Sequence, residues 1–397
     1  MQTNRERGQG MGSVYQSDID QIAQNASIPW RDFEGKTIVV TGATGLVGGM
    51  LARAIIRHGE LAGERTKVIL PVRNMEKARR MMSEPGSGQP GVEAARSSAA
   101  KRGLFEHGPT PGCPEPGHND VVLAEWDAAT GVLPAIETCD YIIHCASNTN
   151  SKLMVQNPVD TIMVTFEGTR SMLDVARATG ARMCFVSSME VYGPGGSQPL
   201  NESHGGELDA MNVRSSYPQA KQMAETLCAS YAKQYGVEVC VARLAQTFGP
   251  GVANTDARVF AEFARCCRDG KNISLLTDGS KSNMYVYTAD AVAALLLLAA
   301  RGAVGEAYNV ANEQTFCSIW EMANAVSESF GTHTKVTRVY DSDAAARYAV
   351  SGSLRLDTQK IRAMGWEPTV GLMEMYSRMM ADWDDQTEQR GVSPLLG

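Results

Sequence analysis

The sequence has neither a long apolar run nor an excess of basic residues. Its longest uninterrupted apolar stretch, residues 291–300, has ten residues, whereas a membrane-spanning helix needs about 20. The 37 Lys and Arg are outnumbered by 44 Asp and Glu, which gives a net charge of −7. Because nucleic acids and anionic membranes attract proteins through a positive field, we expect neither of them as a partner.

Cysteine occurs nine times but never as a C-x-x-C pair, and no His and Cys cluster has metal-ligand spacing. An odd, scattered set is typical of reduced, packed thiols, so the sequence predicts neither a disulfide framework nor a metal site. Residues 1–12 are polar and do not resemble a secretory signal, so we expect a cytoplasmic protein. The G-x-S-x-G motif is also missing, which argues against the common hydrolase class.

What the sequence does contain is an alternation of apolar strands and amphipathic helices. Nearly all-apolar strands separated by helices are typical of a parallel sheet that helices cover on both faces. The pattern predicts an α/β fold, a Rossmann-type doubly wound parallel sheet with a smaller C-terminal substrate-binding lobe. The expected strands are residues 37–41, 67–72, 121–123, 141–145, 183–187 and 238–244, and the expected helices include 18–26, 75–82, 159–179, 217–235 and 290–301.

Composition divides the chain into three parts. Residues 1–34 are expected to be a leader and a lead-in helix, and 35–245 a dinucleotide-binding domain. Within that domain, residues 83–119 are rich in Pro, Gly, Ser and Ala, which predicts a mobile insertion. Residues 246–397 are expected to be mainly the substrate-binding lobe, with the helix at 290–301 packing back on the first domain.

Three evenly spaced glycines follow the first strand. The segment from Thr41 to Gly48 reads T-G-A-T-G-L-V-G and opens a helix. Gly42 permits the tight turn, Gly45 lets a pyrophosphate approach the backbone, and Gly48 allows close helix–strand packing. A turn that only links the two elements is the alternative, but strand, turn and helix together favour dinucleotide binding at the helix N-terminus. The predicted contacts are Gly42, Thr44, Gly45, Leu46, Val47 and Gly48.

The end of the second strand bears on the choice of cofactor. An acid usually stands there in NAD enzymes and accepts the ribose hydroxyls, but this chain reads L-P-V-R-N at residues 70–74. Arg73 can pair with a 2′-phosphate instead, and Lys77 adds a second positive charge one helical turn later. The pattern favours NADP and leaves NAD open. The alternative is that both cations belong to a solvated helix start.

Tyr217 and Lys221 lie four residues apart near the start of an expected helix, and hence on one face. A neighbouring ammonium is expected to stabilise the phenolate and to lower the pKa of Tyr217, so that the phenol exchanges a proton with a sugar hydroxyl near neutral pH. Lys221 can also hold the nicotinamide ribose. Such a pair recurs by chance, but together with the glycine turn it becomes specific.

With these motifs the sequence resembles the extended short-chain dehydrogenase/reductase superfamily, in particular its NAD-dependent epimerase/dehydratase branch, which acts on nucleotide-activated sugars. The resemblance covers about residues 35–380 without the insertion. It implies that Asp127 reads the adenine and that His144–Ser147, H-C-A-S, matches a strand-end signature whose backbone lies near the cofactor. The cofactor contacts implied there are Cys145, Ala146 and Ser147.

The same resemblance extends to the reacting groups. Residues 187–193 match the family's S-S-x-x-V-Y-G stretch, which implies that Ser188 hydrogen-bonds the reacting sugar oxygen. Tyr217 and Lys221 match the family's Y-x-x-x-K pair. Relatives commonly dimerise through helices that include the Tyr–Lys helix, so a homodimer is expected as well.

Glu190 occupies a position at which the family's sugar dehydratases and UDP-glucuronate decarboxylases commonly have Glu, whereas simple 4-epimerases often do not. Once C4 is a ketone, a carboxylate there could take the C5 proton or orient the loss of a C6 carboxylate. Met189 replaces the acid with which dTDP-glucose dehydratases eliminate water. The alternative for Glu190 is a solvated loop charge.

The second lobe departs from the family pattern in two places. Gln246 stands where R-x-x-N-x-x-G-P has its Asn, and Asn283 stands where G-x-x-x-R-x-F-x-Y has its Arg. One expected diphosphate contact is therefore missing. Arg258 precedes the expected substrate-binding helix and is a candidate partner for a phosphate or carboxylate.

Together these features predict an enzyme with a retained NAD(P) that oxidises C4 of a nucleotide sugar, with Tyr217 as base, Ser188 on the C4 oxygen and Lys221 tuning Tyr217. Glu190 favours decarboxylation or dehydration over epimerisation. Two rivals stay open. One is a net NADPH-dependent carbonyl reductase, suggested by the V-R-N stretch at residues 72–74, and the other is a dinucleotide-sensing protein without catalysis.

Overall fold

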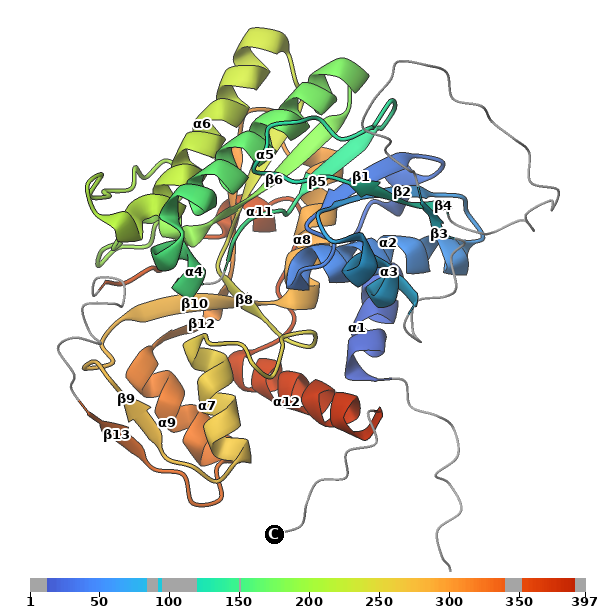
Figure 1. Cartoon of the computed structure of the whole chain (residues 1–397). Helices are drawn as coiled ribbons and strands as arrows, with labels where there is room; N and C mark the ends of the chain where they lie inside the picture. The colour runs from blue at the N-terminus through green and yellow to red at the C-terminus, as the bar shows by residue number, and fades with distance from the viewer. Residues whose placement is uncertain (1–12, 84–91, 95–119, 150, 340–351, 390–397) are drawn as a thin grey trace, which may run out of the picture.

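The computed structural model describes residues 13–83, 92–94, 120–149, 151–339 and 352–389 (Figure 1). The predicted leader over residues 1–12 lies outside these ranges, as does the predicted insertion except for residues 83 and 92–94. No helix within the described ranges is long and apolar enough to cross a membrane.

The larger domain is built on eight strands in the order β11-β7-β6-β5-β1-β2-β4-β3. All pairings between neighbouring strands are parallel, which confirms the predicted α/β, Rossmann-type doubly wound sheet. The strands are β1 (Thr37–Thr41), β2 (Lys67–Val72), β3 (Val92–Ala94), β4 (Asp120–Glu125), β5 (Tyr141–His144), β6 (Arg182–Ser188), β7 (Val239–Leu244) and β11 (Ala307–Val310).

The position of β1 creates the crevice of the sheet. The chain runs from β1 to β2 and β4 on one side and then continues at β5, which pairs with the other side of β1, with Thr41 opposite His144. Connections leave the carboxyl ends of β1 and β5 in opposite directions, and ligands of doubly wound folds bind in the gap between them. The ends of these two strands therefore mark the expected dinucleotide site.

Helices cover both faces of this sheet (Figure 1). Buried side chains of α2 and α8 pack on one face and those of α5 and α6 on the other. Leucine and alanine side chains of α8 are buried around most of the helix, as its uninterrupted apolar run requires. The helices of this domain are α1 (Val14–Ala23), α2 (Leu46–Ala62), α3 (Met75–Ser83), α4 (Ser151–Gln156), α5 (Pro158–Thr179), α6 (Ser216–Tyr235) and α8 (Thr288–Arg301), with short 3-10 turns η1 (Trp30–Phe33), η2 (Met189–Tyr192) and η3 (Val213–Ser215).

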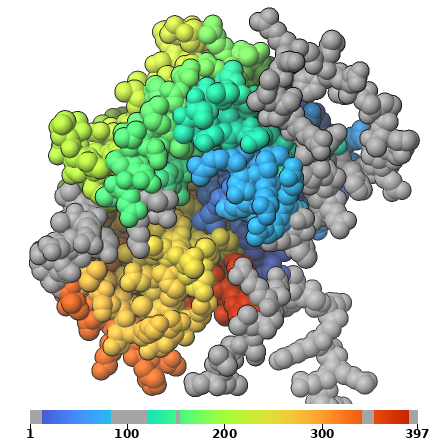
Figure 2. Space-filling model, in the orientation of Figure 1, coloured from blue at the N-terminus to red at the C-terminus, as the bar shows by residue number. Residues whose placement is uncertain are grey.

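A smaller lobe lies beside the carboxyl edge of the sheet, and in Figure 2 its gold and orange surface meets the blue and green surface of the larger domain. It contains a three-stranded sheet in the order β12-β10-β8, a two-stranded sheet of β13 and β9, and its own apolar core. Its elements are β8 (Gln246–Phe248), α7 (Val259–Arg268), β9 (Ile273–Leu275), β10 (Ser282–Tyr287), β12 (Asn312–Ser318), α9 (Ile319–Phe330), β13 (Val336–Arg338) and α12 (Leu372–Gln389). The short helix α11 (Gln359–Arg362) packs against β11 of the main sheet instead, with Ile361 in the core of the larger domain.

Three details differ from the sequence expectations. The lead-in helix α1 begins at Val14, before the expected start at residue 18, because Ser13 caps its first turn by accepting from Gln16 N. It ends at Ala23, before the expected end at residue 26. The predicted insertion at 83–119 contains β3, which adds a strand to the edge of the sheet beside β4. Strand β11 belongs to the main sheet beside β7, although it follows the predicted domain boundary at residue 245.

Candidate active site

The glycine turn between β1 and α2 has the close packing that its sequence predicts. Gly42 adopts a φ of 69°, a left-handed conformation that favours glycine. A Cβ on Gly48 would lie 2.5 Å from the carbonyl oxygen of Gly42, and one on Gly42 would lie 2.9 Å from the Ala146 nitrogen. Neither position therefore has room for a side chain.

The same turn offers a place for a dinucleotide pyrophosphate. Gly45 is exposed and begins α2 in an extended conformation, and no side chain caps this helix start. Uncapped N–H groups at a helix N-terminus attract an anion. The bare backbone of the turn and the uncapped helix thus fit the group that the sequence implies, with Leu46 and Val47 in the first helical turn.

The end of β5 is fastened to the glycine turn by a buried hydrogen-bond pair. Thr41 Oγ1 lies 2.7 Å from His144 Nδ1 and accepts a hydrogen bond from Ala146 N at 3.0 Å. Burial lowers the pKa of His144 to about 3, and the charge of Lys221 lowers it further. His144 is therefore a neutral, structural side chain, and burial likewise raises the pKa of Cys145 to about 12. Ser147 continues this segment, its Oγ 3.4 Å from Thr165 Oγ1.

The two cations predicted to select NADP lie at the carboxyl end of β2. Arg73 is exposed just after the strand, and Lys77 extends from α3 so that its Nζ donates to Thr44 O in the glycine turn at 3.1 Å. Asn74 accepts from Lys77 N and so caps this helix. Asp127 follows the neighbouring β4 and accepts from Ala129 N at 3.0 Å. The fold brings Lys77 onto the glycine turn and leaves Arg73 in solvent.

The three predicted reacting groups converge from two elements. Tyr217 and Lys221 occupy the start of α6, where they are 7% and 2% exposed. Ser188 ends β6 and hydrogen-bonds the Tyr217 side chain. The Ser188 Oγ also accepts from Glu190 N at 3.2 Å, so it fixes both the phenol and the start of η2.

The pKa of Tyr217 differs from the sequence expectation. Burial raises it above the usual phenol range, and the negative charge of Glu190 raises it further, while the Ser188 hydrogen bond and the Arg258 charge act in the opposite direction. Lys221 does not produce the expected lowering, because its Nζ donates to Val186 O at 2.7 Å and stands 5.9 Å from the Tyr217 ring centroid. Burial also lowers the pKa of Lys221 to about 8, which weakens it as a permanent cation.

Glu190 lies in η2, exposed, beside the crevice. Its charge acts on Tyr217 and also on Lys281 at the start of β10. This places the carboxylate between the reacting phenol and a cation of the smaller lobe. The sequence analysis did not identify Lys281 or its neighbour Arg214 as site residues. A signal for Lys281 was present, because side chains alternate along a strand and residues 281 and 283 therefore lie on one side of it.

The smaller lobe contributes two buried amides. Gln246 Oε1 and Asn283 Oδ1 find no hydrogen-bond partner among the described residues. They come from the adjacent strands β8 and β10, which pair with Gln246 opposite Tyr285. Arg258 precedes α7 and forms an ion pair with Asp256 at 2.6 Å. Because buried polar atoms are normally satisfied, the two free amide oxygens mark a place for a ligand.

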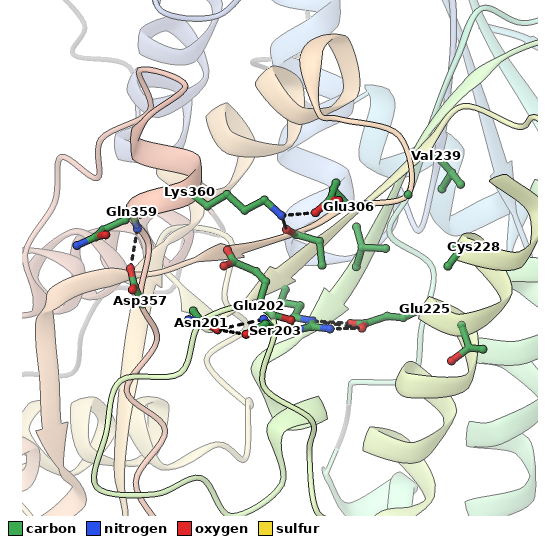
Figure 3. A pocket seen from close by; sticks show the side chains of 16 residues that line it. Asn201, Glu202, Ser203, Glu225, Cys228, Val239, Glu306, Asp357, Gln359 and Lys360 are labelled. Carbon is green, nitrogen blue, oxygen red and sulfur yellow. Dashed lines mark hydrogen bonds and ion pairs between the residues drawn. The ribbon is translucent and has the colours of Figure 1, made fainter. Parts of the chain in front are cut away.

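A pocket of about 780 Å³ lies elsewhere, at the β7–β11 edge of the sheet (Figure 3). Two ion pairs line it: Glu225 accepts from Arg243 at 2.7 Å, and Lys360 donates to Glu306 at 2.7 Å. Glu225 also accepts from Ser187, beside Ser188. The pocket contains neither the reacting phenol nor the glycine turn, so we assign it a structural role behind β6.

A glycine turn at the crevice of a doubly wound sheet, facing a buried Tyr–Lys pair, defines a dinucleotide-dependent enzyme of the short-chain dehydrogenase type. Comparison with known proteins gives the family. Residues 38–311 match the NAD dependent epimerase/dehydratase family, and the chain belongs to it. The resemblance inferred from the sequence motifs is thereby confirmed.

Relatives and solved structures agree with this assignment. UDP-glucuronic acid decarboxylase 1 of Xenopus tropicalis is 30% identical over 65% of this chain and 59% of its own length. UDP-glucuronic acid decarboxylase 6 of Arabidopsis thaliana is 31% identical over 63% of this chain and 71% of its own. The match thus spans less than two thirds of the first relative's length.

Two solved structures share the fold. UDP-glucose 4-epimerase of Thermotoga maritima has a TM-score of 0.65 at 20% identity over 88% of this chain and 99% of its own. A dTDP-glucose 4,6-dehydratase of Streptomyces venezuelae, solved with NAD bound, has a TM-score of 0.65 at 18% identity over 90% of this chain and 100% of its own. At such identities the likeness concerns the fold.

Proposed function

We propose that the protein removes the C6 carboxyl group of a UDP-linked uronic acid, using a retained nicotinamide dinucleotide. The observation that carries this proposal is the junction of β6, η2 and α6, where Tyr217, Ser188 and Glu190 lie together. The decarboxylases among the relatives support this outcome over dehydration and epimerisation. Met189, where dTDP-glucose dehydratases have an acid, also argues against loss of water.

In the first step the C4 hydroxyl of the sugar becomes a ketone. Tyr217 accepts the hydroxyl proton, which requires its phenolate; the Ser188 hydrogen bond and the Arg258 charge favour that form. When bound, an oxidised nicotinamide supplies the acceptor for the C4 hydride and later returns it. As the C4 hydroxyl gives up its proton, the single Ser188 O–H turns from Tyr217 to the C4 oxygen, donates to it and fixes the ring against Tyr217.

In the second step the C5–C6 bond breaks and carbon dioxide leaves. The electron pair of that bond passes to C5 and is delocalised onto the C4 oxygen as an enolate, which hydrogen bonds from Ser188 and the protonated Tyr217 stabilise. A proton then adds to C5 in place of the lost carboxyl group; in this proposal Glu190 takes that proton up from water and delivers it to C5. Hydride return to C4, with the Tyr217 proton going to the oxygen, restores the C4 hydroxyl and leaves a UDP-linked pentose.

The direct test incubates the purified protein with UDP-glucuronic acid and follows carbon dioxide and the nucleotide products by mass spectrometry. Tyr217→Phe should lower turnover by at least 10³-fold, since general base catalysis and the fixed position of the C4 oxygen are lost together. Loss of water, or a change of stereochemistry without loss of mass, would replace decarboxylation by dehydration or epimerisation. Steady consumption of NADPH at 340 nm would instead support a reductase, and full activity of Tyr217→Phe would overturn the proposal.

For the cofactor we propose NADP, with Arg73 and Lys77 facing its 2′-phosphate. Both cations stand at the carboxyl end of β2, and residues 72–74 include no acid. Mass spectrometry of the copurified dinucleotide tests this. Arg73→Asp should weaken NADP binding at least tenfold and leave NAD binding within twofold. If the purified protein contains NAD and Arg73→Asp does not change NADP binding, the cofactor is NAD.

We also propose a homodimer through the helices α4, α5 and α6, which pack against one another (Figure 1). Their outer faces expose large apolar side chains, including Val159 at 68% and Met223 at 55%, the type of surface that association buries. Met223→Glu should convert a dimer to a monomer in light scattering, and Val304→Glu, on another exposed surface, should not. A monomeric wild type would refute the dimer.

A nucleotide sugar is the partner that the proposal requires, and nucleic acid and membrane remain unexpected. We propose a cytoplasmic location, which cell fractionation tests.

A further inference from the structure

Lys281 and Arg214 are neighbouring cations, and the Glu190 carboxylate also acts on Lys281. Lys281 precedes β10 in the smaller lobe, and Arg214 belongs to η3, just before the Tyr–Lys helix. Within the described ranges neither forms an ion pair, whereas Arg243 and Arg258 pair with Glu225 and Asp256. In addition, the Nε of Arg214 is buried and has no hydrogen-bond partner among the described residues.

The backbone around Lys281 is fixed from both sides. Its carbonyl accepts from Ile319 N at 2.9 Å, and the next residue, Ser282, accepts from Leu354 N at 3.0 Å. Ser353, between them, bridges Ser282 on one side and Gly195 on the other. Because neighbouring strands lie about 4.8 Å apart, this ladder holds the start of β10 about 10 Å from the loop that follows η2.

The charges around Lys281 agree with this placement. The Glu190 carboxylate favours its ammonium form, while burial and the Arg214 guanidinium lower its pKa. A group that is largely withdrawn from water beside a second cation gains from an added anion. The neighbouring position 283 carries an amide, so Lys281 is the cation that β10 presents at this end.

We propose that Lys281 and Arg214 form the subsite for the C6 carboxylate of the sugar, a proposal that rests on the proposed function. Glu190 acts on both Tyr217 and Lys281, so Lys281 lies on the side of the site where C4 reacts. C6 is two bonds from C4, whereas the diphosphate leaves from C1 across the ring. Without these cations the negative charge of the substrate carboxylate would be repelled by that of Glu190. The positive charges of Lys281 and Arg214 balance the negative charges of Glu190 and the C6 carboxylate.

The subsite determines specificity by selecting uronic acids over neutral sugars. The test is calorimetric binding to the holoenzyme in the inactive Tyr217→Phe background, with UDP-glucuronic acid and UDP-glucose as probes. Lys281→Met should weaken binding of UDP-glucuronic acid at least tenfold and leave UDP-glucose within twofold, and Arg214→Gln should act in the same direction. Lys281→Arg should keep the preference. Lys271→Met, a lysine paired with Asp269 on the surface of the same lobe, is the control and should change neither.

The outcomes are distinct. If Lys281→Met weakens the binding of both ligands equally, Lys281 contacts the diphosphate, and if it weakens neither, Lys281 is not part of the site. Either result overturns the proposal. So does a protein with native Lys281 that binds UDP-glucuronic acid and UDP-glucose equally. In the active enzyme, Lys281→Met should raise KM for UDP-glucuronic acid far more than it lowers kcat. If the wild type prefers UDP-glucuronic acid through Lys281 but releases no carbon dioxide, the proposed reaction fails and the carboxylate subsite stands.

Discussion

The central question at the scale of single residues is how a buried phenol is made to exchange a proton. Burial and Glu190 both raise the pKa of Tyr217, and among the described residues Ser188 and Arg258 lower it. Lys221, buried as well, is itself destabilised as an ammonium. Burial thus disfavours both the Lys221 ammonium and the Tyr217 phenolate that the proposed reaction requires, and perturbed pKa values of this kind are typical of functional residues.

Lys221→Met should therefore stabilise the protein while it abolishes turnover. A pKa lowered from 10.5 to about 8 corresponds to about 3 kcal/mol of destabilisation at pH 7, against which the lost hydrogen bond to Val186 O costs about 1 kcal/mol. We expect the free energy of unfolding to rise by about 2 kcal/mol in urea titrations without added dinucleotide. Lys233→Met, an exposed lysine of the same helix, should change it by less than about 1 kcal/mol.

The pH dependence of the unfolding free energy distinguishes removal of a buried ammonium from improved packing as the reason why Lys221→Met is more stable. Below pH 8 both folded and unfolded wild type carry the Lys221 proton, so the destabilisation is complete. Between pH 8 and 10.5 only the unfolded state still binds the proton, so the wild type gains stability relative to the variant as pH rises. A difference between the two proteins that stays constant from pH 7 to 10 would contradict the burial argument.

At the scale of secondary-structure elements, the proposed chemistry takes place at junctions between strands and helices. In that proposal the β1–α2 turn receives the dinucleotide, the end of β6 supplies Ser188, and the start of α6 supplies Tyr217. All three lie at the carboxyl edge of one parallel sheet, because each strand of the sheet points the same way. The smaller lobe then closes this edge with β8 and β10.

Gly48→Ala tests the β1–α2 junction. The new Cβ would lie 2.5 Å from the Gly42 carbonyl oxygen, a backbone atom that moves only if the whole turn moves. We expect dinucleotide affinity to fall at least tenfold and the unfolding free energy to fall by about 1–3 kcal/mol. Gly371→Ala, whose Cβ would meet nothing within 4 Å, is the matched control; equal behaviour of the two variants would show that the turn tolerates a side chain.

At the scale of the whole molecule, helix α1 joins the two lobes. Its Asp18 accepts a hydrogen bond from Tyr287 of β10 and pairs with Arg378 of α12 at 3.1 Å. The adjoining side chains of Ile19 and Ile22 are 1% and 3% exposed in the core of the larger domain. Helix α1 thus helps to set the position of the smaller lobe relative to the main sheet.

Truncation of Ile22 measures this contribution. Ile22→Ala should lower the free energy of unfolding by about 2–5 kcal/mol, since a buried branched side chain is removed from a packed core. Leu61→Ala, at an exposed end of α2, should cost less than about 1 kcal/mol. Urea unfolding followed by tryptophan fluorescence gives both values, and similar losses in the two variants would mean that α1 is not part of the cooperative core.

Much of the architecture was open to prediction from the sequence, because it rests on local patterns. Apolar strands bounded by amphipathic helices predicted every strand of the main sheet except β3 and β11. β3 has three residues within the stretch rich in Pro, Gly, Ser and Ala, and β11 has four residues beyond the expected first domain. Their places beside β4 and β7 follow from long-range pairing. The domain boundary at residue 245 missed β11 for the same reason.

The sequence by itself determined the glycine turn, the parallel sheet and the Tyr–Lys spacing, since each depends on residues within one turn or one strand. Only the tertiary structure decided the ionisation of that pair, because desolvation depends on what the whole chain packs around it. It alone brought Lys281 and Arg214, 67 positions apart in the sequence, close to one another and brought the Glu190 carboxylate near Lys281. Charges from distant segments interact through space, and no local pattern encodes their distance.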